Sequence, residues 1–213
     1  MPGLHTASGR PGTAMTTLTD SACGEIKIGL IYGSIREGRF CDTVANWAAG
    51  ELTRTGQFLV DAIDPRQIRM AAWPEPMGAR DIEGLRHRID RAEAFVVVTP
   101  EYNHGYPAAL KFLIDSASRE WAFKPVALVS YGGASGGLRA IEQLRLVFAE
   151  LHAITIRDTV SLPHAWRSFD SAGRPSAPEE PSRAIRVMLK SLAWWATVLR
   201  QARNATPHDV AAA

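Results

Sequence analysis

Three segments of the chain carry the residue types that could bind an anion or a flat aromatic ring. They are Gly33–Phe40, Thr99–Asp115 and Ser130–Gly137, and each follows a short apolar run. In open parallel α/β sheets, ligands bind beyond the carboxyl ends of the strands. These segments are therefore the candidates for a binding site.

The first segment, Gly33–Phe40, reads GSIREGRF. Gly33 allows a tight backbone turn, Ser34 can donate its hydroxyl, and Arg36 and Arg39 can donate charged hydrogen bonds to a phosphate. The helix expected to follow would add unpaired N–H groups and a positive dipole end. This pattern predicts a phosphate site, and the alternative is a solvated turn with two incidental arginines. It is neither a dinucleotide-binding GxGxxG nor a P-loop, because no Gly-Lys-Ser/Thr follows.

The second segment crowds polar and aromatic side chains between prolines. A flat ligand needs hydrogen bonds at its edge and an aromatic or apolar wall on its face, and this segment offers both. His104 titrates near neutrality and could donate a proton, although a surface histidine is the alternative. Lys111 is expected to be a helix-surface charge. The residues that form this candidate site are Pro100, Glu101, Tyr102, Asn103, His104 and Tyr106.

The third segment, Ser130–Gly137, reads SYGGASGG. Its glycines let backbone N–H groups approach a ligand closely, and the alternative is a flexible connector. Tyr131 either packs on the ligand or fills the edge of the sheet.

Alternating apolar runs and amphipathic segments predict the elements that position these loops. Strands are expected at 26–32, 58–63, 94–99, 125–131 and 153–160, and helices at 42–55, 81–92, 108–118, 138–151 and 184–203. This alternation predicts an α/β fold, a flavodoxin-like three-layer sandwich with a five-stranded parallel sheet of order 2-1-3-4-5. Pro-rich loops are expected at 64–78 and 162–181.

The domain organisation is expected to be simple. Residues 1–24 show no periodic apolar face and are predicted to be a disordered tail, with Met15 as an alternative start. Residues 25–213 are predicted to form a single domain.

Composition excludes several classes of protein. The net charge of +2, without a basic run, argues against a nucleic-acid partner. No apolar run is long enough to span a membrane, and the N-terminus does not resemble a secretory signal. The 6 histidines and 2 cysteines lack paired ligand spacing, so no metal site is expected. Cys23 and Cys41 could form a disulfide, but two free thiols in a reducing cytoplasm are the simpler interpretation.

Together, GSIREGRF, TPEYNHGYPAALKFLID and SYGGASGG resemble the NADPH-dependent FMN reductase family, over about Ile26 to Arg203. The family includes quinone, azo-dye and chromate reductases of flavodoxin-like fold. The resemblance implies non-covalent FMN, with its phosphate on the first segment and its ring along the second, and with the third near the pyrimidine edge. The implied FMN-binding residues are Gly33, Ser34, Arg36, Arg39, Phe40, Pro100, Glu101, Tyr102, Asn103, Tyr131, Gly132 and Gly133.

Two departures from the family pattern affect this comparison. Many members have Ser-Phe-Asn where this chain has Arg39-Phe40-Cys41, and Leu-Lys-Asn where it has Leu110-Lys111-Phe112. The first concerns the phosphate contacts, and the second concerns a contact near the ring or a dimer interface.

The resemblance implies an oxidoreductase that passes a hydride from NADPH or NADH through FMN to a small acceptor. The acceptor is a quinone, a free flavin, an azo compound or an oxidised metal, and no catalytic side chain is required. The alternative is a non-enzymatic flavodoxin-type electron carrier or FMN-binding module. Such carriers are usually strongly acidic, unlike this chain of net charge +2.

The acceptor pocket and the assembly are further expectations. His104, Tyr106 and, from a neighbouring subunit, Trp166 are expected to line the open face of the flavin. A homodimer, which can pair into a tetramer, is expected from the family habit and from several tryptophans. These are Trp121, Trp166, Trp194 and Trp195, for which burial in the core is the alternative.

Overall fold

The computed structural model describes residues 24–68 and 79–206 of the chain. Within them, five strands form one parallel sheet of order β2-β1-β3-β4-β5, which confirms the predicted flavodoxin-like arrangement. The strands are β1 (Ile26–Tyr32), β2 (Phe58–Ile63), β3 (Ala94–Pro100), β4 (Pro125–Gly132) and β5 (Ile154–Pro163). The helices are α1 (Cys41–Arg54), α2 (Ala79–Arg91), α3 (Ala108–Asp115), α4 (Leu138–Glu150), α5 (Ala165–Ser168) and α6 (Glu179–Ala205), and Arg119–Trp121 forms a 3-10 turn.

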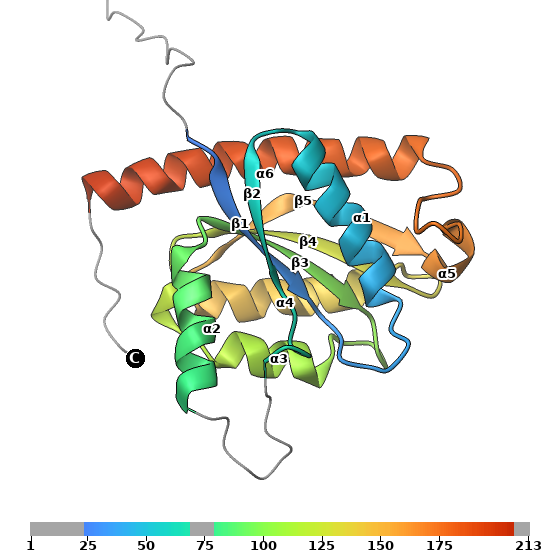
Figure 1. Cartoon of the computed structure of the whole chain (residues 1–213), viewed down its shortest axis with the longest axis horizontal. Helices are drawn as coiled ribbons and strands as arrows, with labels where there is room; N and C mark the ends of the chain where they lie inside the picture. The colour runs from blue at the N-terminus through green and yellow to red at the C-terminus, as the bar shows by residue number, and fades with distance from the viewer. Residues whose placement is uncertain (1–23, 69–78, 207–213) are drawn as a thin grey trace, which may run out of the picture.

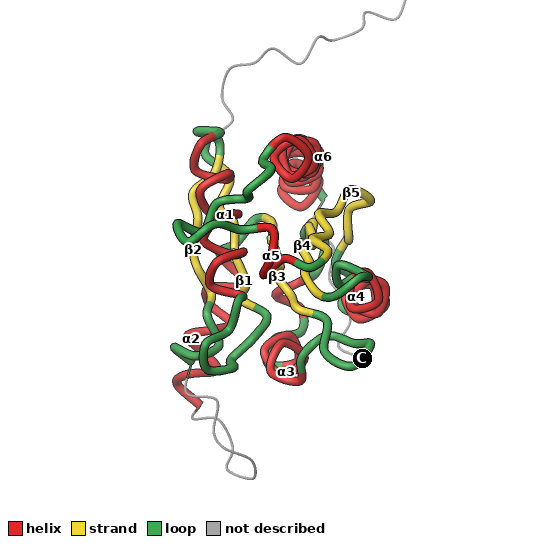
Figure 2. The backbone as a smooth tube through the Cα atoms, turned by 90° about the vertical axis from the view of Figure 1, so that its right-hand side faces the viewer, coloured by secondary structure: helices red, strands yellow, loops and turns green. Residues whose placement is uncertain are grey.

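Helices cover both faces of the sheet (Figure 1). α1 and α6 pack on one face, and α2, α3 and α4 pack on the other, so the apolar core consists of two clusters separated by the strands. Viewed from the side, α6 and α3 lie on opposite sides of the sheet (Figure 2). Every residue of β3 and β4 is buried, as expected for central parallel strands covered on both faces.

The structure corrects the sequence prediction most strongly between β5 and α6. Residues 162–181 were expected to be a loop, but they contain the end of β5, the short α5 and the first turn of α6. α6 begins at Glu179 because Glu179 and Glu180 suit the positive end of the helix dipole, and Pro181 is tolerated in a first turn. The helix is therefore five residues longer at this end than its apolar periodicity indicates, from Glu179 rather than Ala184.

α3 ends earlier than predicted, at Asp115 rather than Ser118. Trp121 explains the early end, since its buried indole donates a 3.1 Å hydrogen bond to the carbonyl of Ile114 and holds the 3-10 turn against the helix.

The four tryptophans that were considered for a subunit interface differ in burial. Trp121 is fully buried, with its ring 4.6 Å from Phe95 and 5.5 Å from Phe148, so the core alternative is correct for this residue. Trp166 and Trp194 are 53% and 59% exposed, and Trp195 is half-buried. Two of the four indoles therefore lie mostly on the surface.

Parts of the prediction lie outside the described residues. These are the tail up to residue 23 and residues 69–78 of the first Pro-rich loop. In the described part of the chain, no helix combines the length and apolar character needed to cross a bilayer. Over the same ranges, no group of three or more His, Cys, Asp or Glu side chains is arranged to hold a metal ion.

Candidate functional site

The three candidate loops meet at one edge of the sheet. They follow β1, β3 and β4, which are adjacent parallel strands, so their carboxyl ends lie side by side. Gly33 donates a 2.7 Å backbone hydrogen bond to the carbonyl of Val98, and a Cβ added at Gly33 would lie only 2.6 Å from that oxygen. Only glycine permits this approach, which brings the first loop against β3.

The first loop leaves backbone donors available for an anion. α1 begins at Cys41, and its N-cap residue Phe40 makes no side-chain capping bond, so the N–H groups of the first turn have no capping acceptor. Among the described residues, the N–H groups of Ile35, Glu37 and Gly38 also donate to no protein acceptor. These donors adjoin the positive end of the helix dipole, the arrangement that binds phosphate in many proteins. The loop therefore has the chemistry of an anion site.

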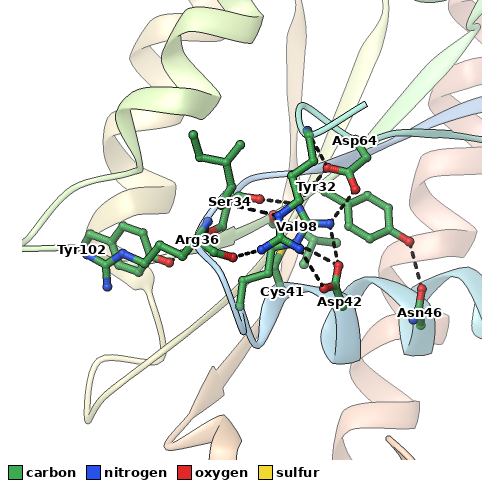
Figure 3. A network of polar contacts seen from close by, with 12 residues as sticks. Tyr32, Ser34, Arg36, Cys41, Asp42, Asn46, Asp64, Val98 and Tyr102 are labelled. Atoms are coloured by element: carbon green, nitrogen blue, oxygen red, sulfur yellow. Dashed lines mark hydrogen bonds and ion pairs between the residues drawn. The ribbon is translucent and has the colours of Figure 1, made fainter. Parts of the chain in front are cut away.

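Arg36 is available to this site. Its guanidinium carbon lies 3.7 Å from the centroid of the Tyr102 ring, a cation–π contact. The hydroxyls of Ser34 and Tyr102 share a 2.9 Å hydrogen bond, and Figure 3 shows Arg36 extended towards Tyr102. No carboxylate of the described residues forms an ion pair with Arg36. Tyr102 therefore links the first loop to the second and holds Arg36 by stacking.

Arg39 lies in a different environment. Its side chain is only 2% exposed and forms ion pairs with Asp42 and Asp64. Nε and Nη2 donate to Asp42, Nη1 and Nη2 donate to Asp64, and Nη1 also donates to the carbonyl of Ser34. These five bonds use all five N–H donors of a guanidinium. The sequence predicted Arg39 among the FMN-binding residues, but its donors are occupied by the protein itself.

The ion pairs shift the ionisation of their members. Burial alone would lower the pKa of Arg39, but the hydrogen bonds that it donates to Asp64 and Asp42 outweigh burial and raise the pKa. Burial alone would raise the pKa of Asp64, but hydrogen bonds from Arg39 and Arg66 hold it below its ordinary value. Arg39 and Asp64 are therefore both charged at neutral pH.

The second loop forms a tight turn at its tip. Tyr102 and Gly105 exchange backbone hydrogen bonds of 2.9 and 3.1 Å, and both residues between them have positive φ, Asn103 at 50° and His104 at 74°. The side chains of Asn103 and His104 are exposed there. Gln143 of α4 donates a 2.8 Å hydrogen bond to the carbonyl of His104. This turn presents polar groups at the sheet edge, and the hydrogen bond from Gln143 holds it against α4.

Glu101 bonds to α4 rather than projecting freely. Its carboxylate accepts hydrogen bonds from the Ser135 hydroxyl at 2.9 Å and from the backbone and guanidinium of Arg139 at 3.1 and 2.8 Å. Burial acts to raise the pKa of Glu101, and these bonds more than offset it and lower the pKa. Glu101 therefore joins the second loop to the third.

The third loop is held firmly. Gly136 and Gly137 have positive φ, and a Cβ on Gly137 would lie 2.6 Å from Cβ of Ser130, so glycine is required there. The N–H of His164 donates to the carbonyls of Gly132 and Gly133 at 2.8 and 3.2 Å.

Three other predicted FMN-binding residues lie wholly or partly in the core. The ring of Tyr131 is 5% exposed and its centroid lies 6.0 Å from that of Phe40, so Tyr131 fills the sheet edge. Phe40 is half-buried and also packs on Phe169. Pro100 is buried as the last residue of β3.

The three residues predicted for the acceptor pocket differ in their surroundings. His104 is exposed at the tip of the second loop, whereas Tyr106 leans against the core cluster beneath α3. Trp166 belongs to α5, with its ring centroid 5.9 Å from that of His164. Lys111 forms a 2.6 Å ion pair with Asp115 along α3, as suits a surface charge.

Sequence reasoning missed several residues that hold the loops. Asp64 and Arg66 follow β2, and Arg139 and Gln143 belong to α4. Asp64 was detectable in principle, because it directly follows the last residue of a parallel strand and so lies at the same sheet edge. Nothing in the sequence indicated that Arg139 would pair with Glu101.

Comparison with known proteins identifies the family to which the chain is similar. Residues 26–167 match the family model of NADPH-dependent FMN reductases. The chain is 39% identical over 121 residues to an NAD(P)H-dependent FMN reductase of Schizosaccharomyces pombe, covering 52% of this chain and 60% of that protein. It is 32% identical to an NAD(P)H:quinone oxidoreductase of Solanum tuberosum, covering 78% of this chain and 91% of that protein.

A solved structure supports the fold. FerB, a flavoenzyme NAD(P)H:(acceptor) oxidoreductase from Paracoccus denitrificans, superposes with a TM-score of 0.65 at 18% identity, covering 81% of this chain and 98% of that one.

The guanidinium of Arg36, which forms no ion pair in the described residues, is expected to bind the FMN phosphate. Arg36→Ala should weaken FMN binding by about 1.5–3 kcal/mol, roughly tenfold to a hundredfold, because a charge-assisted hydrogen bond to the phosphate is lost. Flavin titration measures the change. Arg54→Ala is the control, since Arg54 lies at the other end of α1 and forms its ion pair with Glu51 of the same helix. Unchanged FMN affinity in the Arg36 variant would remove Arg36 from the site.

Proposed function

The chain belongs to the NADPH-dependent FMN reductase family, and we propose that its three loops hold FMN and support hydride transfer from NAD(P)H to a small acceptor. The observation that carries this proposal is the set of open N–H donors at the first loop and the uncapped start of α1. They suit one phosphate group, and the sequence offers no second pyrophosphate loop, which favours FMN over a dinucleotide.

The residues present fit this cofactor. The N–H groups of the first loop, the hydroxyl of Ser34 and the guanidinium of Arg36 would hold the phosphate. The Pro100–Asn103 segment would lie along the ring, and the N–H of Gly133, whose neighbouring carbonyls are turned towards His164, would face the pyrimidine edge. When bound, FMN supplies the chemistry, since it accepts a hydride from reduced nicotinamide and passes it to the acceptor. The chain contributes binding, orientation and electrostatics, and no side-chain nucleophile is needed.

The acceptor class follows from the open side of this site. We infer a flat acceptor, a quinone or a second flavin, that lies against His104 and Tyr106, with Trp166 supplied by a neighbouring subunit. The activities for which two relatives are named support this inference, since one is a quinone oxidoreductase and another an FMN reductase. Azo compounds and oxidised metals are further acceptors that an exposed flavin face admits.

The proposal also includes the oligomeric state and the cellular location of the protein. Trp166 and Trp194 expose apolar rings that suit an interface, and this supports a homodimer, from which a tetramer can form. A cytoplasmic location suits Cys41, a free and buried thiol.

Direct reduction by NADPH separates an enzyme from an electron carrier. The flavin-loaded protein, mixed with NADPH without oxygen, should lose its visible flavin absorbance with no second protein present. Free FMN with NADPH is the control for uncatalysed reduction. Steady-state rates with a panel of quinones, flavins, azo dyes and oxidised metals, using NADH and NADPH, then rank the substrates. Reduction that requires an added partner reductase would instead identify a carrier.

The oligomeric state of the protein can be measured directly. Light scattering at micromolar concentration should give twice the mass of one chain, or four times if dimers pair. Trp194→Ala and Trp166→Ala, made separately, should lower this mass if either ring lies in the interface, because each removes a large exposed apolar surface. A monomer mass for the unaltered protein would contradict the dimer.

The acceptor pocket is tested through Tyr106. Tyr106→Ala should raise the KM for a quinone several-fold, because the aromatic wall is lost, while the rate at which NADPH reduces the bound flavin stays nearly unchanged. Stopped-flow measurement of the two half-reactions provides both values. A slower reductive half-reaction with an intact oxidative one would assign this loop to nicotinamide instead.

A further inference from the structure

Two arginines bind carbonyl groups of the first loop, Arg39 from within the loop and Arg66 from the segment after β2. Arg39 donates to the carbonyl of Ser34. Arg66, from the segment after β2, donates to the carbonyl of Ile35 at 3.3 Å and also to the carbonyl of Arg36. Three consecutive carbonyls, at positions 34, 35 and 36, are thus turned towards guanidinium groups.

The geometry of the peptide bond gives this arrangement a consequence. In a trans peptide, the C=O of one residue and the N–H of the next point in opposite directions. Because the carbonyls of Ser34 and Arg36 face the arginines, the N–H groups of Ile35 and Glu37 face away from them. These two are among the N–H groups that find no acceptor in the described residues. The arginines therefore orient peptide planes whose donors remain open on the opposite side of the loop.

Two carboxylates hold the arginines in place. Asp64 binds Arg39 through both oxygens at 2.8 and 2.5 Å, and its Oδ1 accepts a 2.9 Å hydrogen bond from the backbone N–H of Arg66. Asp42, in the first turn of α1, binds Nε and Nη2 of Arg39 and lies 3.8 Å from the guanidinium of Arg66. Figure 3 shows Asp64 and Asp42 converging on the loop from β2 and from α1.

The charges of this group balance, since two arginines face two aspartates. It therefore adds little net attraction for an anion, and its effect must come from orientation. Arg39 has no free N–H donor for a ligand, which separates its role from that of Arg36. Asp64 directly follows β2, beyond the three loops that meet at the site.

We propose that Arg39, Arg66 and Asp64 are positioning residues that aim the N–H groups of the first loop at the flavin phosphate, so that the end of β2 sets the preference for FMN over riboflavin. This inference rests on the proposed function. Arg39 acts through the carbonyl of Ser34 and makes no contact with the cofactor. Arg66 acts in the same way through the carbonyls of Ile35 and Arg36.

The test compares FMN with riboflavin, which lacks the phosphate. Asp64→Asn keeps the shape of the side chain but turns an amide N–H towards the guanidinium of Arg39, which opposes the pairing. Its Kd for FMN should rise about tenfold, whereas its Kd for riboflavin should change less than about twofold. Arg66→Gln, at a side chain that is 36% exposed, should give a smaller loss with the same selectivity for FMN.

Asp61→Asn is the matched control, because Asp61 lies on β2 and pairs with Arg88, away from the loop. It should leave both flavin affinities unchanged. Riboflavin binding also reports whether each variant is folded, and Arg66→Gln decides the matter if Asp64→Asn does not fold.

The contrary outcomes are distinct. Unchanged or tighter FMN binding in Asp64→Asn would mean that Arg39, once released, binds the phosphate itself, and would overturn the proposal. If the affinities for FMN and riboflavin fall equally, these residues only maintain the overall structure of the site. That result would also overturn the proposal. Failure of the unaltered protein to bind FMN would instead contradict the proposed function.

Discussion

Backbone N–H groups that lack an acceptor are the constraint on which this site depends. An α-helix leaves its first N–H groups unpaired, and a side-chain cap usually satisfies one of them. α1 has no such cap, and the loop before it leaves further donors open. The close approach of Gly33 to Val98, the stacking of Arg36 on Tyr102 and the pairing of Glu101 with Arg139 all fix the loops around these donors. A phosphate bound at this loop, as proposed, would accept hydrogen bonds from several of these donors at once.

The buried ion pairs of Arg39 contribute mainly by orienting the first loop, rather than by stabilising the fold. Burying a guanidinium and a carboxylate costs several kcal/mol per ion, and their attraction repays this cost only when the hydrogen bonding is nearly complete. The five bonds of Arg39 meet that condition. Replacing such a pair with apolar residues is often neutral for stability. Apolar residues could not donate a hydrogen bond to a loop carbonyl, so orientation is the contribution specific to this pair.

The sequence predicted the sheet well because its signals were local. β1 and β2 begin and end where the apolar runs do, and the strand order follows from the alternation of strands and helices. The three loops were also located correctly at the carboxyl edge. The roles within them were harder to predict, because Arg36 and Arg39 are three residues apart and chemically identical. Their ion pairs distinguish them, because Arg39 binds Asp42 and Asp64, and the contact with Asp64 joins residues 25 positions apart. The early start of α6 was missed because charged residues and proline, rather than apolar spacing, determine it.

The meeting of three loops from β1, β3 and β4 also links cofactor supply to the survival of the folded chain. No single strand–helix unit contains the proposed site, so a partly folded chain that lacks any of these strands would not assemble it. A ligand that binds only the native state stabilises it by about 2.7 kcal/mol when its concentration is a hundredfold above Kd. Flavin abundance in the cell would then control how much of this protein escapes proteolysis, and the chain would accumulate where its cofactor is plentiful.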